Sequence, residues 1–108
     1  MTPFGIRKMQ QFIHERYANM TIYVTENGWG DQNLTIEEGA LNDIDRCNYY
    51  REYIGNVSLA VHEDGVDVGG YFAWSLMDNF EWADGYTTRF GLTYVDYETQ
   101  VRTTKYSF

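Results

Sequence analysis

The sequence predicts an α/β fold built around one βαβ unit. Residues 21–25 are all β-branched or aromatic, which favours a short strand. Residues 42–62 carry apolar side chains at intervals of three and four, which predicts a helix. Residues 66–74 have an apolar end and predict a second strand. Strands joined in this way run parallel, so both should end at the sheet edge where α/β folds bind ligands.

A helix is expected before the first strand. Thr2 is the predicted N-cap and Pro3 the first helical residue, where its missing N–H costs nothing. An apolar stripe at helical spacing should cover the sheet, and it consists of Ile6, Met9, Ile13 and Tyr17. His14 is assigned to the surface or the rim of the core, and residues 18–19 should end the helix. Because residues 21–25 do not alternate cleanly, we expect their strand to be covered on both faces.

A long connection, from residue 29 to about residue 40, follows the first strand. Loops of this length in compact folds are usually functional. The central helix should be capped by Asn42 or Asp43 and stopped by residues 63–65. Gly55 interrupts it at a cost of roughly 1 kcal/mol relative to alanine. The apolar seam of this helix is expected at Ile44, Cys47, Tyr50, Ile54, Val57 and Val61.

The end of the chain is expected to be irregular and then to form a hairpin. Gly69 and Gly70 allow another backbone to approach the second strand closely. An acidic and aromatic segment follows at residues 78–86. Residues 90–97 and 101–103 then predict a short hairpin that turns at residues 98–99.

Composition excludes several kinds of partner. A net charge of -8 and a pI near 4.5 would repel nucleic acid and anionic membranes. Aromatic residues make up 18% of the chain, and their flat rings suit sugar faces as well as ordinary cores. Cys47 is the only cysteine, so the chain has no internal disulfide and no thiolate metal site. No apolar run approaches the ~18 residues of a membrane span.

Three Asn-X-Ser/Thr sequons, at Asn19, Asn33 and Asn56, slightly favour a secretory route. About one such sequon is expected by chance from the asparagine content. Glycosylation also requires that each acceptor be exposed.

Glu26 is the first candidate for catalysis. It follows the first predicted strand directly, and Asn27 and Gly28 after it favour a turn. A carboxylate at this sheet edge is well placed for chemistry, although many glutamates at strand ends are only solvated loop residues. Glu81 is a second acidic candidate in the segment after the second strand, and from this chain alone it could serve as a proton donor.

Residues 24–28 resemble the nucleophile motif of the family 1 glycoside hydrolases, the β-glucosidase and β-galactosidase family. Residues 70–82 resemble the C-terminal sugar-binding signature of that family, and the resemblance continues through residues 85–86, 89–92 and 94–97. It implies a (β/α)8 TIM barrel of about four times this length. Residues 1–108 would be an incomplete C-terminal portion, with strands 7 and 8 and the helix between them. Two strands leave open edges, so we do not expect this piece to fold alone.

The resemblance also implies residue roles. Glu26 would be the nucleophile of a retaining glycosidase, which needs an acid carboxyl about 5–5.5 Å away. That acid lies in an Asn-Glu-Pro motif on strand 4 of the family, and the motif does not occur here. Glu81 is therefore assigned to binding sugar hydroxyls. Asn27 should support the loop, and a supporting role is also expected for Asp78, Asn79, Tyr86 and Arg89.

The implied sugar-binding residues form one subsite. Trp74 would be the platform under the sugar in the −1 subsite, Glu81 would accept hydrogen bonds from the 4- and 6-hydroxyls, and Trp82 would donate its indole N–H to the 3-hydroxyl. Phe90 would line the pocket near the 6-position. The alternative for Trp74, Trp82 and Phe90 is ordinary core packing, whereas a buried Glu81 without a ligand would be costly.

The leading hypothesis is thus a retaining β-glycosidase acting on small-molecule β-glucosides, with β-galactosides and β-fucosides also open. Glu81 would repel a 6-phosphate, which makes a phospho-glycoside substrate unsuitable. No metal or organic cofactor is implied. The main alternative is a catalytically inactive receptor or binding module with the same fold, similar to the klotho proteins. A thioglucosidase, which lacks the acid but keeps the nucleophile, would look identical over these residues.

Overall fold

The computed structural model describes all residues except Ala18 and Asn19. The predicted end of the first helix and the sequon at Asn19 therefore lie outside the described residues. The chain divides into two compact units. Unit 1 comprises Met1–Asn27 and Asn48–Phe72, and unit 2 comprises Gly28–Cys47 and Ala73–Phe108.

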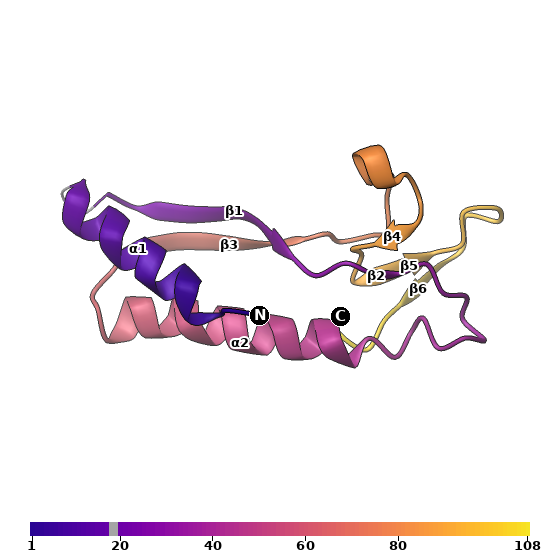
Figure 1. Ribbon diagram of the computed structural model, residues 1–108, viewed down its shortest axis with the longest axis horizontal. Coiled ribbons are helices and arrows are strands. Elements are labelled where there is room, and N and C mark those ends of the chain that lie inside the picture. Colours follow the sequence, from indigo (N-terminus) through magenta and orange to yellow (C-terminus); the bar gives the residue numbers. More distant parts are fainter. Residues whose placement is uncertain (18–19) are drawn as a thin grey trace. The chain divides into compact units, whose positions relative to one another are not determined.

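Helices and short sheets alternate along the chain (Figure 1). In order, the elements are α1 (Phe4–Arg16), β1 (Ile22–Gly28), β2 (Asp31–Gln32), α2 (Ile44–His62), β3 (Val68–Trp74), the 3-10 helix η1 (Trp82–Asp84), β4 (Thr88–Arg89), β5 (Thr93–Val95) and β6 (Arg102–Thr104). The strands of the described residues form three pairs: β1 with β3, β2 with β4, and β5 with β6.

The predicted βαβ unit is present in unit 1. The Ile22 N–H donates to the Asp67 carbonyl at 2.8 Å, and farther along both strands the Tyr71 hydroxyl donates to Asn27 Oδ1 at 2.6 Å. Residue numbers rise together on the two strands, so β1 and β3 are parallel. They run side by side in the same direction in Figure 1, and α2 connects them in sequence.

Strand β1 is longer than predicted, because it continues through Gly28 instead of ending at residue 25. Within unit 2, a Cβ on Gly28 would lie 1.9 Å from the Trp74 carbonyl oxygen, so glycine lets the backbone run close beside β3. Glu26 therefore lies inside a strand and not at the start of a turn. The predicted cover on both faces is also absent from unit 1, where Tyr23 is 57% exposed.

The first helix confirms the predicted position but not the predicted cap. Pro3 is the N-cap residue with helical φ and ψ of -61° and -32°, and there is no side-chain cap, so the assignment of Thr2 was wrong. Ile6 and Gln10 are the buried residues of α1, whereas Met9 is 56% exposed. Neither amide atom of Gln10 has a hydrogen-bond partner among the described residues. His14 is half-buried, which agrees with the rim position among the two that were expected.

Helix α2 begins at Ile44 and ends at His62. Its end agrees with the stop predicted at residues 63–65. Gly65 follows with a φ of +68°, a conformation that favours glycine. The predicted seam is only partly correct, because Ile44 and Ile54 are 41% and 46% exposed. Two seam residues, Tyr50 and Val57, are buried as predicted, and Arg46, Tyr49 and Ala60 are buried beside them.

Unit 2 contains the long connection and the hairpin. The connection holds strand β2, which pairs antiparallel with β4 through Asp31 opposite Arg89. The predicted hairpin is confirmed as β5 and β6, which are antiparallel with Tyr94 opposite Thr103. Within the turn of this hairpin, the backbone N–H groups of residues 98 and 99 donate to the Asp96 carboxylate and lower its pKa.

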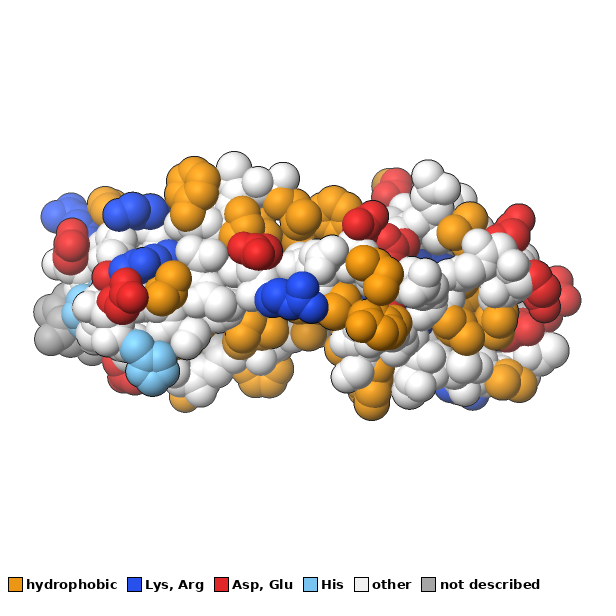
Figure 2. All heavy atoms as spheres, turned by 90° about the horizontal axis from the view of Figure 1, so that it is seen from below, with side chains coloured by type: hydrophobic (Ala, Val, Ile, Leu, Met, Phe, Trp, Pro, Cys, Tyr) orange, Lys and Arg blue, Asp and Glu red, His pale blue; other side chains and the backbone are white. Residues whose placement is uncertain are grey.

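Exposed hydrophobic side chains lie among charged ones on the molecular surface (Figure 2). In unit 1 they include Phe12 at 62% and Phe72 at 58% exposure. None of the described helices has the length and apolarity needed to cross a membrane.

Candidate functional site

The predicted nucleophile belongs to unit 1. Glu26 lies on β1, is exposed, and lines a groove of about 480 Å³ between α1 and β1 together with Gln10 and Tyr53. Residues on successive positions of a strand point to opposite faces, so Glu26 and its neighbour Asn27 face opposite sides of β1.

Two tyrosines hold the side chain of Asn27. The Tyr71 hydroxyl donates to Asn27 Oδ1 at 2.6 Å, and the Asn27 side chain also forms a hydrogen bond with Tyr49. Burial raises the pKa of both phenols above the ordinary tyrosine value. The two hydroxyls therefore stay protonated at neutral pH. Tyr49 is itself packed, because its ring stacks on Tyr53 at a centroid distance of 4.1 Å.

Trp74 and Glu81 lie together in unit 2. Trp74 is the last residue of β3, and its Nε1–H donates to Glu81 Oε2 at 3.4 Å. Both side chains are partly buried. The Trp74–Ser75 peptide bond is cis. The Glu81 N–H donates to the Gly85 carbonyl at 2.7 Å, which closes a short turn around η1. The structure thus brings one predicted platform and one predicted hydroxyl acceptor into contact.

The other two predicted sugar-binding residues, also in unit 2, are placed differently. Trp82 is 82% exposed and has a φ of 44°, a left-handed conformation uncommon for a bulky residue. Core packing is therefore wrong for Trp82 in this chain. Phe90 is partly buried, and a Cβ on Gly30 would lie 2.8 Å from its Cζ atom. Its ring is thus packed directly against the backbone of the loop after β1.

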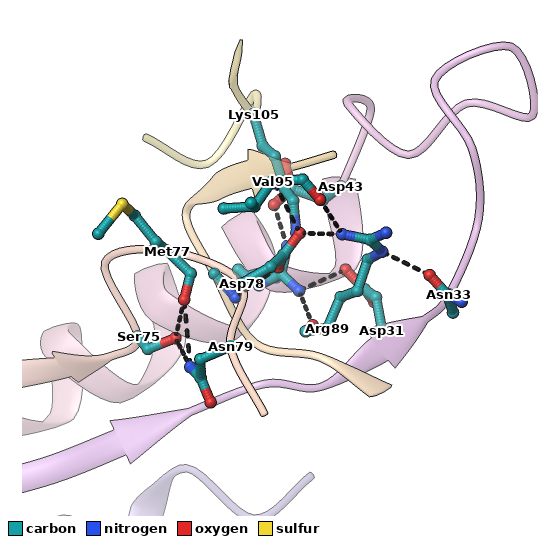
Figure 3. A network of polar contacts seen from close by, with 12 residues as sticks. Asp31, Asn33, Asp43, Ser75, Met77, Asp78, Asn79, Arg89, Val95 and Lys105 are labelled. Carbon is teal, nitrogen blue, oxygen red and sulfur yellow. Dashed lines mark hydrogen bonds and ion pairs between the residues drawn. The ribbon is translucent and has the colours of Figure 1, made fainter. Parts of the chain in front are cut away.

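The segment after Trp74 is fixed by side-chain hydrogen bonds (Figure 3). Ser75 Oγ donates to the Met77 carbonyl at 2.8 Å, and Asn79 Nδ2 donates to Ser75 Oγ at 2.8 Å. Asp78 lies between Met77 and Asn79 in the sequence. Its side chain points away from these hydrogen bonds and is buried. These contacts agree with the supporting roles expected of Asp78 and Asn79.

Asp78 is the centre of a buried ion cluster. Its Oδ2 accepts from Arg89 Nη1 at 2.7 Å, and its Oδ1 accepts from Lys105 Nζ at 2.9 Å (Figure 3). The Gly91 N–H donates to Oδ1 at 2.9 Å. The Arg89 guanidinium also lies 4.2 Å from the centroid of the Tyr94 ring, a cation–π distance. Burial lowers the pKa of Lys105, although its hydrogen bond to Asp78 opposes the shift.

A second ion cluster surrounds Arg46, whose side chain is fully buried. Its Nη2 lies 2.9 Å from Asp31 Oδ2, its Nη1 forms an ion pair with Asp43, and its Nη2 donates to the Arg89 carbonyl at 2.6 Å. Burial raises the pKa of Asp31, and the charge of Arg46 works against that shift. We call six groups the buried charge network: Asp31, Asp43, Arg46, Asp78, Arg89 and Lys105. Five of them are buried, and the side chain of Asp31 at the edge of the network is 30% exposed.

Sequence reasoning missed most of this network. Arg46 lies on the predicted helix, and the only sequence signal was its spacing of three residues from Asp43, which fits an i,i+3 ion pair. Among the described residues, no group of three His, Cys, Asp or Glu side chains has the arrangement of a metal site.

The chain resembles known proteins over its whole length. The pattern of glycosyl hydrolase family 1 matches residues 1–108. Beta-glucosidase 1B of Phanerodontia chrysosporium is 56% identical over 100 residues, which cover 91% of this chain and 18% of that protein. The chain spans about a fifth of the length of the curated relatives it matches.

Solved structures agree in fold. A rice Os3BGlu6 β-glucosidase in a covalent complex with Glc superposes with a TM-score of 0.92 and 46% identity, covering 97% of this chain and 23% of that one. Beta-glucosidase 2 from the fungus Trichoderma reesei gives a TM-score of 0.91 and 54% identity over the same shares of the two chains. The fold is thus that of part of a (β/α)8 barrel. The chain belongs to glycosyl hydrolase family 1.

Proposed function

We propose that this chain is the part of a retaining β-glycosidase, similar to β-glucosidases, that carries the nucleophile Glu26 and part of the −1 sugar subsite. The observation that carries the proposal is the position of Glu26 on β1 of a parallel βαβ unit in a family 1 chain. Strands β1 and β3 would be the seventh and eighth of the barrel. The acid/base carboxyl comes from another segment.

The reaction follows from the chemistry of two carboxylates. Glu26 attacks the anomeric carbon and forms a covalent glycosyl ester, while the acid protonates the departing glycosidic oxygen. Water then hydrolyses the ester, with the acid now acting as base. The rice Os3BGlu6 structure in a covalent complex with Glc supports such an intermediate in a relative that is 46% identical.

Unit 2 supplies the sugar contacts in this proposal. The Trp74 indole donates to one oxygen of Glu81, which leaves the other oxygen to accept hydrogen bonds from sugar hydroxyls. The exposed Trp82 indole offers its N–H to a hydroxyl, and Phe90 closes the side near the 6-position. A β-glucoside fits this set, and β-galactosides or β-fucosides remain open. A phosphate on the 6-position of the sugar would be repelled by the Glu81 carboxylate, so a phospho-glycoside is not a suitable substrate.

A barrel chimera tests the proposal. Residues 1–108 replace the matching segment of the Trichoderma reesei enzyme, which is 54% identical and supplies the remainder of the barrel. The chimera should hydrolyse p-nitrophenyl β-glucoside. Glu26→Gln should lower kcat by at least about 1,000-fold, because the covalent step loses its nucleophile. Glu37→Gln removes an exposed carboxylate from the long connection of unit 2 and should leave kcat unchanged.

Covalent trapping makes the test specific to the residue. A 2-deoxy-2-fluoro-β-glucoside with a reactive leaving group should accumulate an ester that peptide mass spectrometry places on Glu26. Azide should restore turnover to Glu26→Gly and yield the α-glucosyl azide, because the small anion enters the space of the carboxylate. A label on another residue, or full activity of Glu26→Gln, would disprove the assignment.

A further inference from the structure

We propose that Tyr49 and Tyr71 are positioning residues for Glu26, acting through the side chain of Asn27. The two tyrosines together are called the tyrosine clamp. The inference rests on the proposed function, because it concerns the residue that holds the nucleophile in place. All four residues belong to unit 1.

The clamp holds Asn27 from two separate elements. Tyr71 comes from β3 and donates to the amide oxygen at 2.6 Å, while Tyr49 comes from α2 and is hydrogen-bonded to the same side chain. An amide bound by two groups from different elements cannot rotate about its terminal torsion without breaking a hydrogen bond. The direction of the Asn27 side chain is thus determined by the βαβ unit as a whole.

The hydroxyls of the clamp are themselves fixed. The ring of Tyr49 lies between two others, stacked on Tyr53 at 4.1 Å and edge-on to Tyr50 at 5.7 Å between centroids. Tyr49 is only 7% exposed, and Tyr71 is partly buried. Rings held by packing present their oxygens at defined positions, which is the condition for precise support of a neighbouring group.

Strand geometry carries this restraint to Glu26. Adjacent side chains in a strand leave opposite faces of the same pleated backbone, so a twist of that backbone changes the direction of both Cα–Cβ bonds. With Asn27 held on one face, the backbone at this point twists less freely, and the Cα–Cβ bond of Glu26 on the other face keeps its direction. Glu26 itself is exposed in this chain, and packing around its side chain does not provide that restraint. The clamp therefore restrains the backbone from which the Glu26 side chain extends.

The clamp also explains why two buried phenols are tolerated here. A buried hydroxyl without a partner is unfavourable. The Asn27 amide is a hydrogen-bond partner of both hydroxyls, and Tyr53 is a further partner of Tyr49. Phenylalanine at either position would keep the ring and remove only the hydrogen bond. The two roles, packing and positioning, can thus be separated by single substitutions.

The test uses the barrel chimera and the 2-deoxy-2-fluoro-β-glucoside described above. In each protein the amplitude of labelling reports the folded, competent fraction, and the rate constant reports how well the nucleophile is placed. In this step the Glu26 Oε to C1 bond forms and the bond to the leaving group breaks, and an activated leaving group departs without a proton. The acid residue therefore does not contribute to the rate.

Tyr71→Phe should lower the labelling rate constant by about 10- to 100-fold while the final amplitude stays that of the parent, as expected of a small misplacement of a reacting group. Tyr23→Phe is the matched control, because Tyr23 also lies on β1 and its side chain is 57% exposed. It should label at the parent rate.

An unchanged rate constant in Tyr71→Phe, with Glu26 still labelled, would overturn the positioning role and leave the proposed function standing. If Tyr71→Phe does not fold, Tyr49→Phe removes the other hydroxyl and decides the question by the same two readouts. Failure of the parent chimera to label Glu26 would overturn both proposals. A lower amplitude with the parent rate constant would show that the clamp only stabilises the fold, and would also overturn the inference.

Discussion

Removing the charge of Asp78 should destabilise unit 2 strongly. The side chains of Asp78 and Lys105 are 0% and 1% exposed, and that of Arg89 is 5% exposed. Asp78→Asn keeps the shape of the side chain but leaves two buried cations without their carboxylate. Removal of one partner of a buried ion pair typically costs about 3–5 kcal/mol. Two hydrogen bonds from charged donors, at about 1.5–3 kcal/mol each, give a similar total.

Urea unfolding of the barrel chimera is followed by circular dichroism. The change in the free energy of unfolding is the shift of the urea midpoint multiplied by the parent's slope of free energy against urea concentration. Glu98→Gln removes one exposed carboxylate from the hairpin turn and should shift the free energy of unfolding by no more than about 0.5 kcal/mol. Lys105→Met added to Asp78→Asn should recover part of the loss, because one uncompensated cation is gone. Equal shifts for Asp78→Asn and Glu98→Gln would refute the reasoning.

Three further predictions concern backbone space and ionisation, and all use the same unfolding measurement. Gly28→Ala should lower the free energy of unfolding by about 1–3 kcal/mol or more, because its Cβ would lie 1.9 Å from the Trp74 carbonyl oxygen; Gly55→Ala, in the open on α2, should raise it by about 0.5–1 kcal/mol. Burial raises the pKa of Tyr71 in the folded protein. The contribution of this hydroxyl to stability should therefore be complete below pH 10 and be lost as the pH rises through the pKa of the folded state. Tyr71→Phe should make this alkaline loss of stability less steep. The hydrogen bond to Arg7 lowers the pKa of Asp64 in the folded protein. The stabilisation from this carboxylate should therefore be present above the ordinary pKa of 3.8 and be lost as the pH falls through the pKa of the folded state. If Asp64→Asn lost stability in acid as steeply as the parent, this prediction would be contradicted.

Local patterns predicted the βαβ unit correctly, whereas properties that depend on a partner element were mispredicted. The start and stop of α2 were found within two residues, because periodicity and Gly65 are local signals. The end of β1 was placed at residue 25, because a turn at Asn27 and Gly28 is what local propensity favours. The strand continues to Gly28 because β3 runs alongside it, which no single segment reveals.

The candidate site shows the same division. The family resemblance predicted Trp74 and Glu81 as neighbours in one subsite, and the structure places them in hydrogen-bond contact. The buried charge network could not be read from the sequence, because most charged side chains on a helix such as α2 are solvated. Arg46 becomes buried through groups brought to it from β2, from β4 and from the loop before α2.

The buried charge network has a consequence for the electrostatics of the chain. Its three carboxylates and three cations cancel, so the formal charge of -8 is carried entirely by the other residues. Dissolved ions screen charges that face water far more than charges that are shielded from it. Raising the ionic strength should thus relax the mutual repulsion of the surface acids while leaving the network intact. Salt would act on this chain as a stabiliser through its exterior, with the interior ion pairs indifferent to it.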